Sequence, residues 1–266
     1  MTNKSGMPIF FIHVGEKKFL DIALRQATLA APNSEIIIIT DEIRDLDLDV
    51  KQIHYTDYMG SFLRFKEVYR HISVNLPNYE LVCYARWFFI KDYLSANPMG
   101  QFAVLDSDIM LFQPPEAIAA IIGDRWACDA AWANCFASPQ AVNELCDFYS
   151  MIFADEAQLL ALAQKCAVNG TPHLSDMRLL FELSTRRPEH FLKYETLLRL
   201  GFDGNIRYSE GFAASANGFK ELTWGPGRIP CGRWLETGEI VPFKFLHFQG
   251  PSKECMINVA WNERPA

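Results

Sequence analysis

Residues 101–110, QFAVLDSDIM, give the clearest indication of the fold, because an apolar segment ends there in two aspartates. Residues 101–105 form an apolar run, which predicts a strand buried on both faces, as in a parallel sheet covered by helices. Asp106 and Asp108 stand at its end, and side chains at positions i and i+2 of an extended chain point to the same side. At the C-terminal end of a parallel strand, two such carboxylates can hold a divalent ion together with phosphate oxygens. The alternative is a capping pair where the strand ends.

Before this segment, strand and helix patterns alternate along the chain. Apolar runs at residues 8–14 and 35–40 predict buried strands, and a weaker strand pattern covers residues 52–55. This alternation is typical of an α/β fold in which helices flank a mostly parallel central sheet and the crossovers are right-handed. The intervening helical patterns cover residues 19–27, 62–74 and 81–94.

After residue 112 the pattern changes. Residues 138–139, Ser-Pro, are typical of a helix start, and helical periodicity continues to about Gln164. Residues 201–238 are rich in Gly, Pro, Trp and Arg, which predicts loops and short strands. Residues 243–248 predict a final short strand.

Composition narrows the functional classes. Of the 266 residues, 50% are hydrophobic, so the chain can bury a substantial core as one domain. The net charge of −7 and the absence of a basic run argue against a nucleic-acid partner, because phosphate neutralisation needs clustered cations.

No apolar segment is long enough for a membrane span and the N-terminus lacks a signal-peptide core, so we expect a cytoplasmic protein. The seven cysteines are scattered, without a CxxC pair, and are expected to be reduced thiols.

A second polar motif lies close to the C-terminus. Residues 247–253, HFQGPSK, fit the pattern HxxGxxK directly after the last predicted strand. The imidazole of His247 can supply a third metal ligand. Gly250 lets the backbone approach a phosphate, and Lys253 can neutralise a diphosphate leaving group. For His247 alone, a core histidine before an ordinary glycine turn would be the better interpretation, but the two motifs together are much more specific.

With these two motifs the chain resembles glycosyltransferases of the GT-A fold, particularly the family 8 type that includes glycogenin and bacterial lipopolysaccharide galactosyltransferases. The resemblance implies that Asp106, Asp108 and His247 bind manganese or magnesium. It implies that this ion, Gly250 and Lys253 hold the diphosphate of a nucleotide-sugar donor, expected to be a UDP-sugar. It also implies an acceptor hydroxyl, on a carbohydrate or another molecule, and transfer with retention of the anomeric configuration.

Other residues are carried over from that family one by one. The segment Tyr84-Ala85-Arg86-Trp87 looks like the family's helix before the DxD motif, where an arginine contacts the donor; the alternative for Arg86 is a surface helix arginine. Asp176 stands at the family's Asp-Gln helix start, where it would bind hydroxyls or act in catalysis together with Lys253. It could equally be a helix N-cap. Asn134 is not part of the resemblance: it follows a predicted strand and could touch the donor sugar.

The resemblance covers nearly the whole chain and also has departures. It implies a single domain, residues 1–266, with a nucleotide-binding half at about 8–112 and an acceptor-side half at about 113–266. His13-Val14-Gly15-Glu16 replaces an acidic residue soon after the first strand, which leaves base recognition open. Met177 replaces the family's glutamine, and Glu254-Cys255 replaces its Pro-Trp. Residues that could line an acceptor cleft, or equally be packing residues, are Trp224, Arg228, Arg233 and Trp234.

Two other functions stay open at this level. A phosphatase of the haloacid dehalogenase type also carries its nucleophile in a strand-end DxD. That pattern normally lies near the N-terminus and continues with small or threonine-type residues, whereas this one lies mid-chain and continues with Ile109-Met110. A non-catalytic protein that binds sugars or nucleotides is the third interpretation, and the complete set of residues in the two motifs argues against it. Phosphatase activity on simple esters, or donor binding without turnover, would identify these alternatives.

Overall fold

The computed structural model describes residues 4–15, 18–116, 125–128 and 135–259. Its main sheet has six strands in the order β3-β2-β1-β4-β7-β6. The first four strands run parallel, β7 runs antiparallel to β4, and β6 runs antiparallel to β7. This confirms the predicted α/β class with a mostly parallel central sheet. The strands are β1 (Ile9–His13), β2 (Ile36–Thr40), β3 (Val50–His54), β4 (Phe102–Leu105), β6 (Ala127–Cys128) and β7 (Cys135–Ala137).

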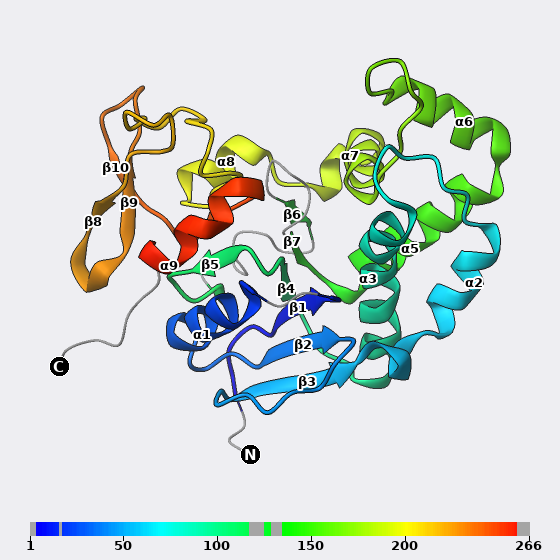
Figure 1. Ribbon diagram of the computed structural model, residues 1–266, viewed down its shortest axis with the longest axis horizontal. Helices are drawn as coiled ribbons and strands as arrows, with labels where there is room; N and C mark the ends of the chain where they lie inside the picture. Colours follow the sequence, from blue (N-terminus) through cyan, green and yellow to red (C-terminus); the bar gives the residue numbers. More distant parts are fainter. Residues whose placement is uncertain (1–3, 16–17, 117–124, 129–134, 260–266) are drawn as a thin grey trace.

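Helices cover both faces of this sheet (Figure 1). Side chains alternate along a strand, so Ile36 and Ile38 of β2 pack in the core layer of α1, while Ile37 and Ile39 pack in the layer of α3 and α5. Both faces are therefore apolar, which is why the strand has no polar alternation. The helices from residue 20 to residue 165 are α1 (Leu20–Ala30), α2 (Gly60–Val68), α3 (Pro77–Ala96), α5 (Pro139–Ala154) and α6 (Glu156–Lys165).

Three predicted boundaries are wrong, each for a local reason. The helix expected to run to residue 74 ends at Val68, because the backbone of Tyr69 leaves the helical conformation (φ −59°, ψ 132°); further along, Ser73 hydrogen-bonds Glu80. The helix expected to run unbroken to Gln164 divides at Asp155, whose carboxylate accepts the backbone N–H of Gln158 and caps α6. The weak strand predicted at 52–55 begins earlier, and Tyr55 starts a 3-10 helix, η1 (Tyr55–Tyr58).

The C-terminal half adds two small sheets. β5 follows the DxD segment and pairs antiparallel with β11 near the C-terminus, so two distant parts of the sequence form one ribbon. The other sheet has the order β10-β9-β8 and lies at one end of the molecule, opposite α6 (Figure 1). The remaining elements are β5 (Ile109–Leu111), α7 (Asp176–Arg186), η2 (Pro188–His190), α8 (Tyr194–Arg199), β8 (Thr223–Trp224), η3 (Pro226–Arg228), β9 (Pro230–Arg233), β10 (Ile240–Pro242), β11 (Phe245–His247), η4 (Gly250–Cys255) and α9 (Met256–Val259).

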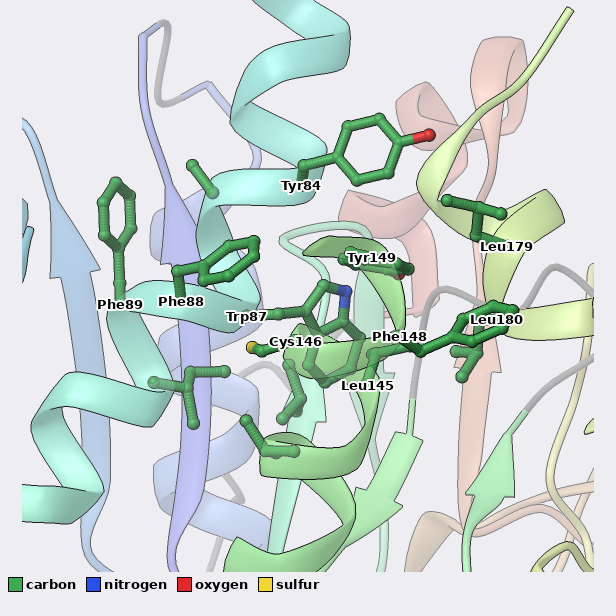
Figure 2. Packing of buried hydrophobic residues seen from close by; sticks show 14 of the residues in the cluster. Tyr84, Trp87, Phe88, Phe89, Leu145, Cys146, Phe148, Tyr149, Leu179 and Leu180 are labelled. Carbon is green, nitrogen blue, oxygen red and sulfur yellow. The ribbon is translucent and has the colours of Figure 1, made fainter. Parts of the chain in front are cut away.

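An aromatic core fixes the helices behind the DxD segment. Figure 2 shows side chains of α3, α5 and α7 packed together, with Trp87 and Tyr149 among them. The hydroxyl of Tyr84 donates to the carbonyl of Leu174 at 3.3 Å, and that of Tyr149 donates to the carbonyl of Asp176 at 3.1 Å. Buried tyrosines of this kind pair their hydroxyls within the core, and here both of them hold the start of α7.

Two expectations about the whole chain can be compared with the described residues. Six of the seven cysteines have free thiols, and three of these six, Cys128, Cys146 and Cys231, are buried. No helix in the described residues combines the length and the hydropathy that crossing a membrane requires.

Candidate active site

The DxD segment is a turn between β4 and β5. The backbone N–H of Ile109 donates to the carbonyl of Asp106 at 3.1 Å, so the segment is not extended as the sequence suggested. The two carboxylates therefore have different surroundings: the side chain of Asp106 is 34% exposed and that of Asp108 is 8% exposed. Ser107, between them, shares a hydrogen bond of 2.9 Å with Nδ1 of His13 at the end of β1.

The β5–β11 ribbon brings the two sequence motifs together. His247 lies opposite Ile109 in the ladder, and the backbone N–H of Phe248 donates to the carbonyl of Asp108 at 2.9 Å. Nε2 of His247 lies 3.5 Å from Oδ1 of Asp108, and Nζ of Lys253 lies 3.1 Å from Oδ2. Burial alone would raise the pKa of Asp108, but His247 and Lys253 outweigh it and the pKa lies below its usual value. The carboxylate is thus charged at neutral pH.

The tautomer of His247 follows from its other contact. Nδ1 lies 2.8 Å from the carbonyl oxygen of Gly204. A carbonyl only accepts hydrogen bonds, so Nδ1 carries the hydrogen, and in the neutral ring Nε2 presents its lone pair toward Asp108. His247 is 1% exposed, so this orientation is fixed inside the protein.

Arg86 joins the DxD segment to α7. Its guanidinium donates to Oδ1 of Asp106 at 2.8 Å and to Oδ2 of Asp176 at 2.7 Å. Burial alone would lower the pKa of Arg86, but the negative charges of Asp176 and Asp106 outweigh this effect, and the pKa of Arg86 lies well above its usual range. Arg86 is 8% exposed, so it is not a surface arginine. Asp176 is not the helix cap either, because Oγ of Ser175 accepts the backbone N–H of Arg178.

The suitability of these residues for a divalent ion rests on Asp108. Its Oδ1 is buried and has no hydrogen-bond partner among the described residues. Ions such as zinc and magnesium bind ligands at about 2.0–2.2 Å, so an oxygen and a nitrogen separated by 3.5 Å can share one ion. Asp106 is committed to Arg86, and within the described ranges no three His, Cys, Asp or Glu side chains already form a metal cluster. The residues fit an ion held first by Asp108 and His247.

Gly250 lies beside an arginine that the sequence did not single out. Gly250 has φ +66°, a left-handed conformation that favours glycine, and it begins the turn that carries Lys253. A Cβ at Gly250 would lie 3.6 Å from Nη1 of Arg207. Arg207 is exposed and makes no ion pair with a described residue, so this turn has two cations near it.

The other predicted residues lie apart from this group or outside the description. Trp224 and Arg233 belong to the three-stranded sheet, and Arg228 to the 3-10 turn beside it. Trp234 packs edge-on against Phe212 with ring centroids 4.9 Å apart, as a packing residue does. Asn134 lies outside the described residues.

Sequence reasoning also missed the polar residues behind His247. Asp203 accepts the backbone N–H of His247 at 2.9 Å and pairs with Lys220 at 2.6 Å. The signal in the sequence was weak, because Asp203-Gly204-Asn205 looks like an ordinary turn and Lys220 like a surface lysine. Only the folded chain brings them behind the HxxGxxK motif.

Comparison with solved structures finds glycosyltransferases. The chain aligns with mouse xyloside xylosyltransferase 1 at 12% identity and a TM-score of 0.52, over 74% of this chain and 87% of that one. It aligns with the galactosyltransferase LgtC, solved with donor and acceptor sugar analogs, at 11% identity and a TM-score of 0.52, over 96% and 95% of the two chains. The bifunctional glycosyltransferase WbbM gives a TM-score of 0.55 at 9% identity, over 98% of this chain and 50% of that one.

These likenesses establish the fold, which is the GT-A fold of these glycosyltransferases. No protein-family model matches the chain, and no curated protein matches its sequence.

Proposed function

We propose that this protein is a glycosyltransferase that moves a sugar from a nucleotide diphosphate donor to a hydroxyl acceptor, with the help of a divalent ion. The observation that carries the proposal is the convergence of Asp108, His247 and Lys253 beside the end of β4. In open α/β sheets, ligands bind beyond the carboxyl ends of the parallel strands, and these three residues lie there. A fold shared with glycosyltransferases supports the same reaction class.

The charge of each residue indicates its role in the proposed reaction. In the reaction the bond between the anomeric carbon and the diphosphate oxygen breaks, and negative charge grows on the diphosphate. Lys253 would stabilise that charge, and Gly250 would let the backbone come close to a phosphate oxygen. Asp108 and His247 would hold manganese or magnesium, which when bound supplies Lewis-acid stabilisation of the leaving group. The metal, the UDP-sugar and the hexosyl group are parts of this proposal carried by the family resemblance.

Arg86 and Asp176 would act on the sugar side of the same site. Because Arg86 bridges Asp106 and Asp176, it holds the DxD turn and the start of α7 in one arrangement. Asp176 is 2% exposed and its carboxylate is engaged by Arg86, which makes it a positioning group for hydroxyls more than a free general base. This supports transfer with retention, in which the departing diphosphate can accept the acceptor proton.

A thermal-shift screen tests the proposal directly. Nucleotide sugars would be added with manganese, with magnesium and with excess chelator, because a ligand that binds only the native state raises the unfolding temperature. We expect a donor that raises it only in the presence of metal, and release of the nucleoside diphosphate from that donor. Stabilisation by donor without any transfer or hydrolysis would identify a binding protein instead. Turnover of simple phosphate esters would identify a phosphatase.

A further inference from the structure

A fully buried lysine lies behind His247. The side chain of Lys220 is 0% exposed, and its ammonium group has three oxygen partners. Nζ lies 2.6 Å from Oδ1 of Asp203, 2.6 Å from Oε2 of Glu210 and 2.8 Å from the carbonyl oxygen of Asn205. An ammonium group has three hydrogens to donate, so these contacts use all of them. Lysine is almost never fully buried unless it is paired in this way.

The partners of Lys220 are the residues that hold His247. Oδ1 of Asp203 accepts from Lys220, and its Oδ2 accepts the backbone N–H of His247 at 2.9 Å. The next residue, Gly204, accepts Nδ1–H of the same histidine. The backbone N–H of Ile206 donates to the carbonyl of His247 at 3.0 Å, and the backbone N–H of Lys220 donates to the carbonyl of Ile206 at 2.9 Å. Residues 203–206 therefore contact His247 at its backbone and at its ring.

We propose that Lys220 is a positioning residue: it fixes residues 203–206 so that His247 keeps its hydrogen on Nδ1 and directs Nε2 toward Asp108. The inference rests on the proposed function for its purpose, because a metal ligand needs an unprotonated nitrogen aimed at the ion. The geometry itself does not depend on a metal. Without the ammonium group, the Asp203 carboxylate keeps only its contact with the His247 amide among the described residues, and Gly204 is freer to move away from Nδ1.

A plain structural role of Lys220 predicts something different. A buried ion pair that only stabilised the fold would be lost with a fall in stability, and the ring of His247 would keep its tautomer. Buried pairs are often replaceable by neutral groups, since removal of both charges avoids the penalty of leaving one alone. The double variant Lys220→Met/Asp203→Asn removes two of the three charges of this network, and Asn can still accept the His247 amide. Glu210 keeps its charge, and its side chain is 15% exposed. The single variant Asp203→Asn leaves Lys220 with Glu210 and serves if the double variant does not fold.

The direct readout is the tautomer of His247 in the metal-free protein. Long-range 1H–15N spectra distinguish hydrogen on Nδ1 from hydrogen on Nε2 and from a ring that carries both. We expect the wild type to show Nδ1–H, and the Lys220 and Asp203 variants to show a mixture or the other form. The second readout is manganese affinity by calorimetry, which we expect to fall about 10–100-fold, as is usual when a residue that orients a ligand is changed.

Two control variants separate positioning from loss of stability. Asp92→Ala removes the carboxylate that accepts from the backbone and side chain of Ser61, far along α3 from this network, and should lower stability without changing the His247 spectrum. Glu210→Gln removes the negative charge of a Lys220 partner outside residues 203–206 and should change the spectrum least.

An unchanged Nδ1–H tautomer in a folded Lys220 or Asp203 variant overturns the inference. If the tautomer changes while the wild type binds no metal, the positioning role stands and the proposed metal-dependent transfer fails.

Discussion

Replacing Arg86 by methionine should destabilise the protein more than any replacement of a surface arginine. Methionine keeps most of the volume but leaves the carboxylates of Asp106 and Asp176 without their common cation. The Asp176 side chain is 3% exposed, and breaking a buried pair by removing one partner costs about 3–5 kcal/mol. The Asp106 side chain is 34% exposed, so solvent screens that half and it adds at most about 1 kcal/mol. The expected loss is therefore about 3–6 kcal/mol.

Arg186→Met is the matched control on α7. Both arginines lie over an aromatic ring, Arg86 at 5.1 Å from the centroid of Trp87 and Arg186 at 5.2 Å from that of Phe148. Arg186 is paired with Glu182 one turn away and its side chain is 38% exposed, so its ion pair should contribute only about 0.3–0.5 kcal/mol. Urea unfolding of the two variants, followed by tryptophan fluorescence, measures the difference. A loss below about 1 kcal/mol for Arg86→Met, or equal losses for both variants, would refute the assignment of Arg86 as a buried bridge.

The other predictions concern the ligands. Asp108→Asn should abolish metal-dependent transfer and donor hydrolysis while circular dichroism shows an intact fold, and full activity in excess chelator would contradict the metal role. Lys253→Ala should weaken nucleoside diphosphate binding by about 1.5–3 kcal/mol and monophosphate binding less, measured by calorimetry; equal effects would move the lysine away from the outer phosphate. Gly250→Ala should cost about 1–2 kcal/mol of stability, because φ at this residue is +66°, and a variant as stable as the wild type in thermal unfolding would disprove that strain. An α-linked donor should give an α-linked product by NMR, with only partial loss in Asp176→Asn; a β-linked product would make Asp176 the base of an inverting enzyme.

The sheet was predictable because its signals are local. The strands β1, β2 and β4 are apolar except for His13 and Thr40 at the ends of β1 and β2, and both faces of the sheet are covered by helices, so sequence pattern and burial agree. The start of α5 was predictable for the same reason, since Ser138 caps it within three residues. Boundaries failed where a single side-chain hydrogen bond decided the outcome, as the Asp155 cap does at the start of α6.

The sequence predicted several residues of the site, but it did not predict most of the contacts between them. The two motifs named Asp108, His247 and Lys253 from residue type and spacing, and the folded chain brings these three together. The Arg86–Asp176 pair joins residues far apart in sequence, and no spacing rule could have joined them. The Lys220 network could not be predicted, because most lysines lie on the surface and nothing in the sequence around Lys220 indicates that its side chain is buried.

The pairing of β5 with β11 also sets an order of events during synthesis. Ile109 leaves the ribosome long before His247, its partner in the ladder, and a domain generally folds as a unit. Strands β1 to β4 thus emerge on a nascent chain that still lacks both the histidine and the lysine of the second motif. The polar centre is complete only after the final strand docks, so a chain that stops before residue 245 lacks two of its three members.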